Sequence, residues 1–216
     1  LVYIVGEIMN INELSTPCYV IKHEEYVNAI TEIMKEYSSR WNDNVIFGYS
    51  VKTNHLPYLM KIARDYGWWS EVVSPAEYNH GLRQGFDSNR VIYNGPQKLH
   101  NLIEAAKTGG IINIDNFKEL DVLANIPAID IKAKIGLRIN FDLEKLCPGE
   151  TTVGQAVGRF GISYENGDFG RAVARLASMG IKIRGVHMHS STSSRSLEVF
   201  RALANKAIEI IKEFSL

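Results

Sequence analysis

The chain has 216 residues, of which 45% are hydrophobic and 22% are charged, and its 24 basic side chains equal its 24 acidic ones. This composition is that of a soluble globular protein with a sizeable core, and the balanced charge favours neither nucleic acid nor a membrane surface as a partner. There is no basic leader and no apolar run of membrane-spanning length. We therefore expect a cytoplasmic protein with a small-molecule ligand. Neither of its two cysteines is part of a CxxC pair, and we expect Cys18 to be a small buried residue.

Segments typical of strands and of helices alternate along the chain. Short runs rich in Val, Ile and aromatic residues predict six strands, near residues 45–51, 69–73, 90–94, 110–114, 132–140 and 183–189. Apolar residues at helical spacing predict helices over 23–37, 56–66, 75–85, 98–108, 116–123, 169–179 and 197–214. Residues 140–164 contain several glycines and predict a long loop. This alternation indicates βα units and a parallel sheet.

The repeated unit favours a TIM-type (β/α) barrel over a Rossmann domain, because no glycine-rich dinucleotide motif follows the first strand. Closing such a barrel takes about eight units. The chain supplies six and does not begin with Met, so we expect residues 1–216 to be an incomplete barrel domain of a longer protein. An open barrel leaves a sheet edge exposed. Either the parent protein continues beyond Leu216 or another chain covers that edge.

Lys52 is the leading candidate for chemistry. It follows the apolar run 45–51. A lysine at the end of a buried strand is expected to be poorly solvated, which favours the neutral amine, a nucleophile towards carbonyl groups. In a barrel of parallel strands the carboxyl ends carry the chemistry, so Lys52 is placed for Schiff-base formation. The alternative is an ordinary surface lysine just past a core strand.

A second candidate is the histidine pair His187 and His189. Alternation along a strand places both on one face, and His189 lies nearer the carboxyl end, where it is expected to reach the site. The Ser- and Thr-rich continuation can donate hydrogen bonds to an anion such as a phosphate. Two alternatives remain open: both histidines are satisfied interior residues, or His-x-His binds zinc in a hydrolase. No carboxylate ligand is evident nearby, so the zinc site is a weaker hypothesis than Schiff-base chemistry at Lys52.

Several motifs in order make a resemblance specific. The chain resembles the barrel domain of the ornithine/diaminopimelate decarboxylase family, pyridoxal-phosphate enzymes that share the alanine-racemase-like fold. The similarity runs over about positions 15 to 216, and it rests on the segments Tyr49–Asn54, Glu71–Glu77, Asn94–Lys98, Ile114–Asn116, Gly136–Asn140, Arg159–Gly161 and Gly185–His189.

The resemblance implies a cofactor and roles for matching residues. Lys52 matches the lysine that forms the internal aldimine with pyridoxal 5'-phosphate, and His189 the histidine that stacks on the cofactor ring. Arg138 and Glu77 match polar residues of the cofactor pocket, and Thr192 falls where the family often has a serine near the phosphate. The implied activity is decarboxylation of a basic or diamino acid, in polyamine or lysine biosynthesis, by a homodimer.

Departures from the family pattern qualify these expectations. Glu71 stands where the family usually has Asp, and Ser191 where it usually has Gly. The family's glycine-rich phosphate loop, the carboxylate that pairs with the pyridine nitrogen and the C-terminal β-domain are expected beyond residue 216, so the fragment alone should be nearly inactive. The alternatives are an amino-acid racemase, whose lysine is typically followed by Ala-Tyr-Gly, and a non-catalytic pyridoxal-phosphate carrier or regulatory protein.

Overall fold

The structure is a computed structural model, and it describes residues 15–41, 44–151, 158–189, 194 and 196–216. The chain divides into two compact units, residues 1–45 and 46–216. The described part of the first unit contains helix α1 (His23–Trp41), which confirms the predicted helix from residue 23 and extends it to Trp41. Ile30 is the buried residue of this helix. Cys18 is exposed, so the expectation that it is buried was wrong; it precedes the helix.

The second unit is built on a parallel sheet that contains all six predicted strands. They are β1 (Gly48–Ser50), β2 (Trp69–Val72), β3 (Val91–Tyr93), β4 (Ile111–Ile114), β5 (Lys134–Asn140) and β7 (Ile183–His187). Strands β1 to β5 pair in chain order, and β7 pairs with β5. In the described residues no pairing joins β1 to β7, so the strands form an open sheet rather than a closed barrel.

Two short elements lie inside the predicted loop 140–164. Strand β6 (Ile162–Ser163) pairs with the end of β5, through Ile139 with Ile162. Helix α6 (Leu143–Leu146) follows β5, and the Asp142 carboxylate accepts a hydrogen bond from the Lys145 N–H at its start. The segment therefore continues the sheet briefly rather than being loop throughout.

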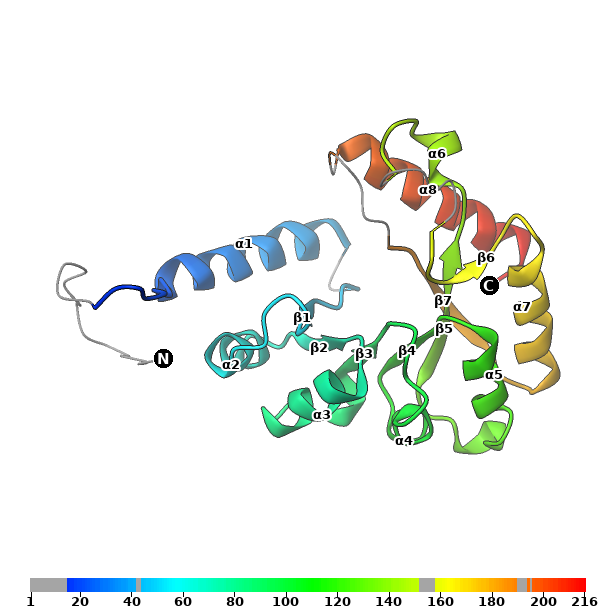
Figure 1. The fold of residues 1–216 in the computed structure, drawn as a ribbon, viewed down its shortest axis with the longest axis horizontal. Helices are drawn as coiled ribbons and strands as arrows, with labels where there is room; N and C mark the ends of the chain where they lie inside the picture. Colours follow the sequence, from blue (N-terminus) through cyan, green and yellow to red (C-terminus); the bar gives the residue numbers. More distant parts are fainter. Residues whose placement is uncertain (1–14, 42–43, 152–157, 190–193, 195) are drawn as a thin grey trace. The chain divides into compact units, whose positions relative to one another are not determined.

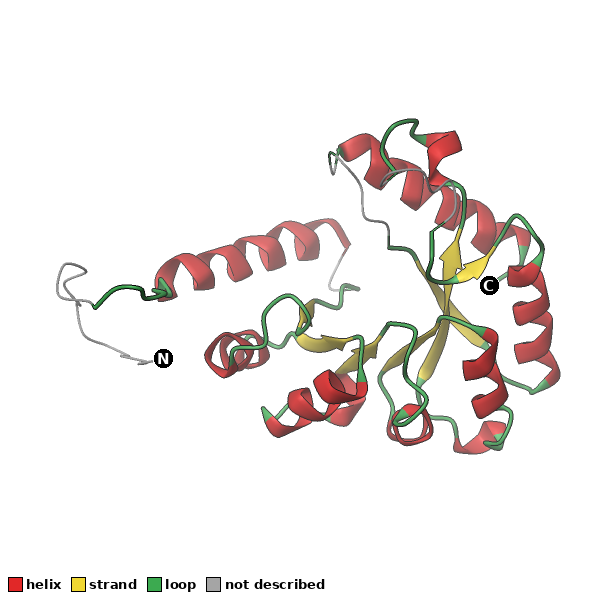
Figure 2. Cartoon of the chain, in the orientation of Figure 1, coloured by secondary structure: helices red, strands yellow, loops and turns green. Residues whose placement is uncertain are grey.

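The remaining helices alternate with the strands, as predicted. They are α2 (Pro57–Asp65), α3 (Pro75–Arg83), α4 (Leu102–Thr108), α5 (Phe117–Leu123), α7 (Asp168–Ser178) and α8 (Leu197–Glu213), with 3-10 turns at Ser88–Arg90 and Ala128–Asp130. Helices α2, α3, α4, α5 and α7 follow one another along one side of the row of strands (Figures 1 and 2). Among the described residues, no helix combines the length and apolarity that crossing a membrane requires.

The core of the second unit lies between the strands and these helices. Side chains that are fully buried come from both layers, among them Val72, Tyr93, Ile114 and Leu137 from the sheet and Met60, Leu102, Leu120 and Leu176 from the helices. The ring of Tyr78 stacks on that of Tyr93, with centroids 5.2 Å apart. Because each strand has apolar residues facing its helix, burial of these side chains stabilises the repeated βα arrangement and fixes the carboxyl edge of the sheet.

Candidate active site

The carboxyl ends of parallel strands meet at one edge of the sheet, and polar residues follow almost every strand there. This edge carries residues from five successive βα units and from β7: Lys52, Glu71, Glu77, Asn94, Asp115, Arg138, His187 and His189. The four of these that belong to the predicted site, Lys52, Glu77, Arg138 and His189, therefore lie on the same edge. Thr192 and Ser191 lie outside the described residues.

Lys52 lies in a turn beyond β1 rather than in the strand. The turn is closed by hydrogen bonds from the Thr53 and Asn54 N–H groups to the Ser50 carbonyl. Val51 is buried, whereas the Lys52 side chain is exposed. The expectation of a poorly solvated Lys52 was therefore wrong for this chain, because the strand ends at Ser50 and the turn carries the lysine out of the sheet. Its amine is accessible from solvent.

His187 is the last residue of β7, and His189 lies two residues beyond the end of the strand. The centroids of the two imidazole rings are 6.5 Å apart, and the ring planes lie at 27° to each other. Burial, followed by the charges of Arg138, His189 and Lys98, lowers the pKa of His187 to about 3. His187 pairs in register with Arg138 on β5, and its buried Nδ1 has no hydrogen-bond partner among the described residues. It is therefore neutral at physiological pH.

His189 is more accessible and has several charged neighbours. Partial burial and the positive charges of Arg138 and Lys52 lower its pKa, whereas Glu71 acts in the opposite direction. These influences place Lys52, Arg138 and His189 in one electrostatic neighbourhood. The site thus combines an amine, an imidazole and a guanidinium.

Arg138 is almost completely buried in β5 and is paired with Asp115. Its Nη1 donates to Asp115 Oδ2 at 2.9 Å, and the two side chains are 9% and 4% exposed. The guanidinium carbon lies 5.0 Å from the centroid of the Phe160 ring. The Nε atom of Arg138 is buried and has no hydrogen-bond partner among the described residues. A buried donor without a partner is rare in proteins, and it points to a missing acceptor.

A chain of amide hydrogen bonds crosses the same edge from β2 to β4. Asn94 Nδ2 donates to Glu71 Oε1 at 2.7 Å, and Asn113 Nδ2 donates to Asn94 Oδ1 at 2.8 Å. Glu71, which departs from the family's usual Asp, is thus held by an amide from the next strand. Gly136 makes room for this chain, because a Cβ there would lie 2.2 Å from Asn113 Oδ1.

Glu77 forms part of the cap of helix α3. Its N–H donates to the Ser74 Oγ at 3.3 Å, and its Oε2 accepts from the Val73 N–H at 2.9 Å. This reciprocal arrangement is a variant of the capping box, in which the third helical residue bonds back to the chain before the helix. Glu77 lies in the first turn of α3, the helix that follows β2, and its predicted contact with a cofactor stays a prediction.

Below the edge, Lys98 and Glu119 form an ion pair with both side chains 0% exposed and 2.9 Å between Nζ and Oε2. Lys98 Nζ also donates to the Gly95 carbonyl, and Glu119 Oε2 accepts from the Asp115 N–H. Burial lowers the pKa of Lys98 and raises the pKa of Glu119, although each charge favours the other's ionised form. The pair joins the loop that follows β3 to the first turn of helix α5.

The sequence did not identify Asp115, Asn94, Asn113 or the Lys98–Glu119 pair as parts of a site. Polar residues at the ends of consecutive strands were the available signal. Among the described residues, no group of three or more His, Cys, Asp or Glu side chains is arranged to hold a metal ion.

Comparison with known proteins gives the family. A model described as "Pyridoxal-dependent decarboxylase, pyridoxal binding domain" matches residues 24–215. The chain belongs to this family. Diaminopimelate decarboxylases of Zymomonas mobilis and Bacteroides thetaiotaomicron are 28% and 29% identical to it, over 92% and 91% of this chain and 48% and 51% of the relatives. The chain therefore spans about half the length of these curated relatives.

Solved structures of decarboxylases share the fold. Diaminopimelate decarboxylase from M. jannaschii, in co-complex with L-lysine, has a TM-score of 0.71 and 20% identity, covering 89% of this chain and 46% of that one. Ornithine decarboxylase from Entamoeba histolytica has a TM-score of 0.63 and 22% identity, covering 89% and 50%. These neighbours are TIM-barrel enzymes, which confirms the predicted fold class, of which this chain supplies part.

The residues on the carboxyl edge fit the family's cofactor, pyridoxal phosphate. An accessible amine matches its aldehyde, and the unpartnered Nε–H of buried Arg138 matches an anionic or phenolic oxygen. The neutral His187 and the neighbouring His189 supply two planar rings at the same edge, against which an aromatic ring can stack. The donor set of this edge therefore suits an aromatic aldehyde that carries negative charge.

Proposed function

We propose that this chain is the cofactor-binding part of a pyridoxal-phosphate-dependent decarboxylase that acts on a basic or diamino acid, with Lys52 as the residue that carries the cofactor. The observation that supports it most is that Lys52, Arg138 and His189 all lie at the carboxyl edge of the parallel sheet. Family membership and the decarboxylase relatives support the same reaction class.

Each residue then has a defined task. Lys52 would hold pyridoxal phosphate through its amine, His189 would lie beside the cofactor's ring, and Arg138 would offer its Nε–H to one of the cofactor's oxygens. Glu77 and Thr192 belong to the pocket by resemblance. Bound pyridoxal phosphate supplies an electron sink for the bond to the departing carboxylate.

The substrate class and the assembly are also proposals. The relatives are named for diaminopimelate, and solved neighbours for ornithine and arginine, which are basic or diamino acids. We propose such a substrate for the full-length protein, acting as a cytoplasmic homodimer. None of the relatives named above is a racemase, which favours decarboxylation over racemisation.

The test of the Lys52 assignment is reductive trapping. Full-length protein is incubated with pyridoxal phosphate, reduced with borohydride and mapped by peptide mass. We expect the label on Lys52, and we expect Lys52→Ala to abolish both the label and carbon dioxide release. Lys61→Ala is the matched control, because Lys61 is an exposed lysine on α2 that pairs with Asp65.

Two results would contradict the proposal: a label on another lysine, or carbon dioxide release that survives in Lys52→Ala. The substrate is found by measuring carbon dioxide release from a panel of basic and diamino acids in L and D forms. Product of inverted configuration without carbon dioxide would support a racemase instead.

A further inference from the structure

The Arg138 guanidinium is held by a hydrogen bond and a ring contact, and neither of them engages its Nε–H. Asp115 Oδ2 binds Nη1, and the Phe160 ring lies 5.0 Å from the guanidinium carbon. Because the guanidinium is planar, fixing one nitrogen and one face also fixes the direction of Nε–H. That nitrogen is the buried one without a partner among the described residues. The two contacts therefore determine where a ligand oxygen can be received.

Asp115 is itself held firmly. Its Oδ1 accepts from the Gly161 N–H at 3.1 Å while Oδ2 binds Arg138, so both carboxylate oxygens are engaged. Its own N–H donates to Glu119 Oε2 at 2.9 Å. Gly161 has φ +89°, and a Cβ there would lie 3.0 Å from the Arg138 carbonyl oxygen, so glycine permits this close approach. Asp115 thus ties the segment after β5 to the guanidinium in β5.

We propose that Asp115 is a positioning residue for cofactor binding: with Phe160 and the Gly161 N–H, it holds Arg138 so that Nε–H is free to bind an oxygen of pyridoxal phosphate. This inference rests on the proposed function. Asp115 does not itself touch the cofactor in this proposal. Its effect on binding passes through Arg138 alone, and this property separates positioning from a general structural role.

The experiment is a double-mutant cycle on cofactor affinity in the full-length protein. The dissociation constant of pyridoxal phosphate is measured by quenching of tryptophan fluorescence for wild type, Asp115→Asn, Arg138→Met and the double variant. Losing the partner of a charge-assisted hydrogen bond should weaken binding by about 10-fold to 100-fold in Asp115→Asn. In the Arg138→Met background the same change should alter affinity by less than about 2-fold, because the positioned group is gone.

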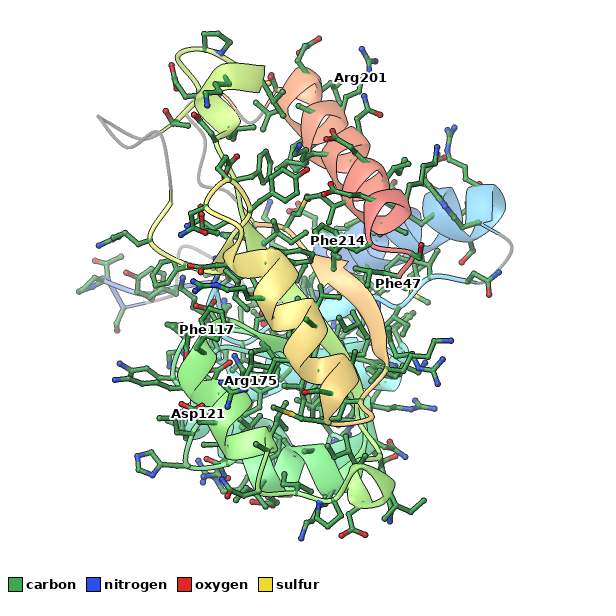
Figure 3. The ribbon with its side chains drawn as sticks, turned by 90° about the vertical axis from the view of Figure 1, so that its right-hand side faces the viewer. Phe47, Phe117, Asp121, Arg175, Arg201 and Phe214 are labelled. Atoms are coloured by element: carbon green, nitrogen blue, oxygen red, sulfur yellow. The ribbon has the colours of Figure 1, made fainter. Side chains whose placement is uncertain are left out.

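Asp121→Asn is the matched control. Asp121 lies on α5, six positions after Asp115 in the chain. It pairs with Arg175 of α7, with 2.5 Å between Arg175 Nη2 and Asp121 Oδ1. Figure 3 shows these side chains between the two helices. This substitution makes the same chemical change at another ion pair, and we expect cofactor affinity to stay within about 2-fold of wild type.

Weakening by the same factor in both backgrounds would overturn the inference, as would wild-type affinity in Asp115→Asn. If Asp115→Asn does not fold, Phe160→Leu takes its place, because Phe160 is 43% exposed and its loss spares the core. Its effect should likewise vanish without Arg138. Trapping on Lys52 in the wild type reports separately on the proposed function, so a labelled Lys52 with an additive cycle refutes the positioning role alone.

Discussion

Replacing Lys98 by Met should strongly destabilise the protein. Lys98 and Glu119 are both 0% exposed, with 2.9 Å between their charged atoms. Without the ammonium, the Glu119 carboxylate stays buried with only the Asp115 N–H as a donor, and its Oε1 already has no partner among the described residues. Breaking a buried pair in this way costs about 3–5 kcal/mol of unfolding free energy.

The pair itself adds little net stability, and this gives a sharper prediction. Burial lowers the pKa of Lys98 and raises that of Glu119, so desolvation outweighs the attraction between the two charges. Removing both, as in Lys98→Met with Glu119→Leu, should therefore recover part of the loss. What remains is the cost of leaving the Asp115 N–H and the Gly95 carbonyl without these partners, about 1–3 kcal/mol for a buried group.

Urea unfolding of the full-length protein, followed by the fluorescence of Trp68 and Trp69 at the start of β2, measures these free energies. Arg175→Met breaks the partly exposed Arg175–Asp121 pair and serves as the control, with an expected loss of about 0–1 kcal/mol. The reasoning is refuted if Lys98→Met loses no more than the control. It is equally refuted if the double variant is less stable than Lys98→Met alone.

Three further predictions concern single residues. Because the pKa of His187 falls to about 3 on folding, the unfolded chain binds a proton below pH 6.5 that the folded chain does not, so stability should fall by about 1 kcal/mol by pH 5.5. Thermal unfolding of wild type and His187→Gln at pH 6.5 and pH 5.5 measures this loss of stability, which the variant should not show. A variant that loses as much stability as wild type would contradict the prediction. Gly136→Ala should lower the free energy of unfolding by about 1–3 kcal/mol in the same assay, because the added Cβ would clash with Asn113. Wild-type stability of this variant would contradict the prediction and show that the Asn113 side chain can move aside. Glu77→Gln should keep its hydrogen bond from Val73 and its stability, whereas Glu77→Ala should lose about 1 kcal/mol in urea unfolding; equal losses would disprove the cap.

The repeated unit could be read from the sequence because its signals are local. Each of the six strands is an apolar run between turn residues, and each helix has apolar residues at a spacing of three and four. The elements that were missed, Ile162–Ser163 and Leu143–Leu146, have two and four residues and are too short to show a period. The short strand forms because β5 extends beyond its last pair with β7, at Arg138, and pairs there with Ile162 and Ser163.

The site was less accessible to sequence reasoning because its contacts join distant residues. Asp115 and Arg138 are 23 positions apart, as are Glu71 and Asn94, and no spacing rule connects them. The exposure of Lys52 depends on where β1 ends, and strand ends are the least certain part of a sequence-based prediction. Position on the carboxyl edge was predictable; the partners of each side chain were not.

The same capping arrangement occurs in two βα units. The residue that it holds differs between them, and only one of the two residues forms an ion pair at the site. In both, the third helical residue is a glutamate whose Oε2 accepts, at 2.9 Å, the N–H of the residue before the cap: Glu77 from Val73, and Glu119 from Asp115. The cap fixes that preceding residue at the carboxyl edge of the sheet. The side chain of Val73 is apolar and forms no ion pair, whereas the carboxylate of Asp115 binds Arg138. The same cap therefore holds an uncharged residue in the α3 unit and the carboxylate that pairs with Arg138 in the α5 unit.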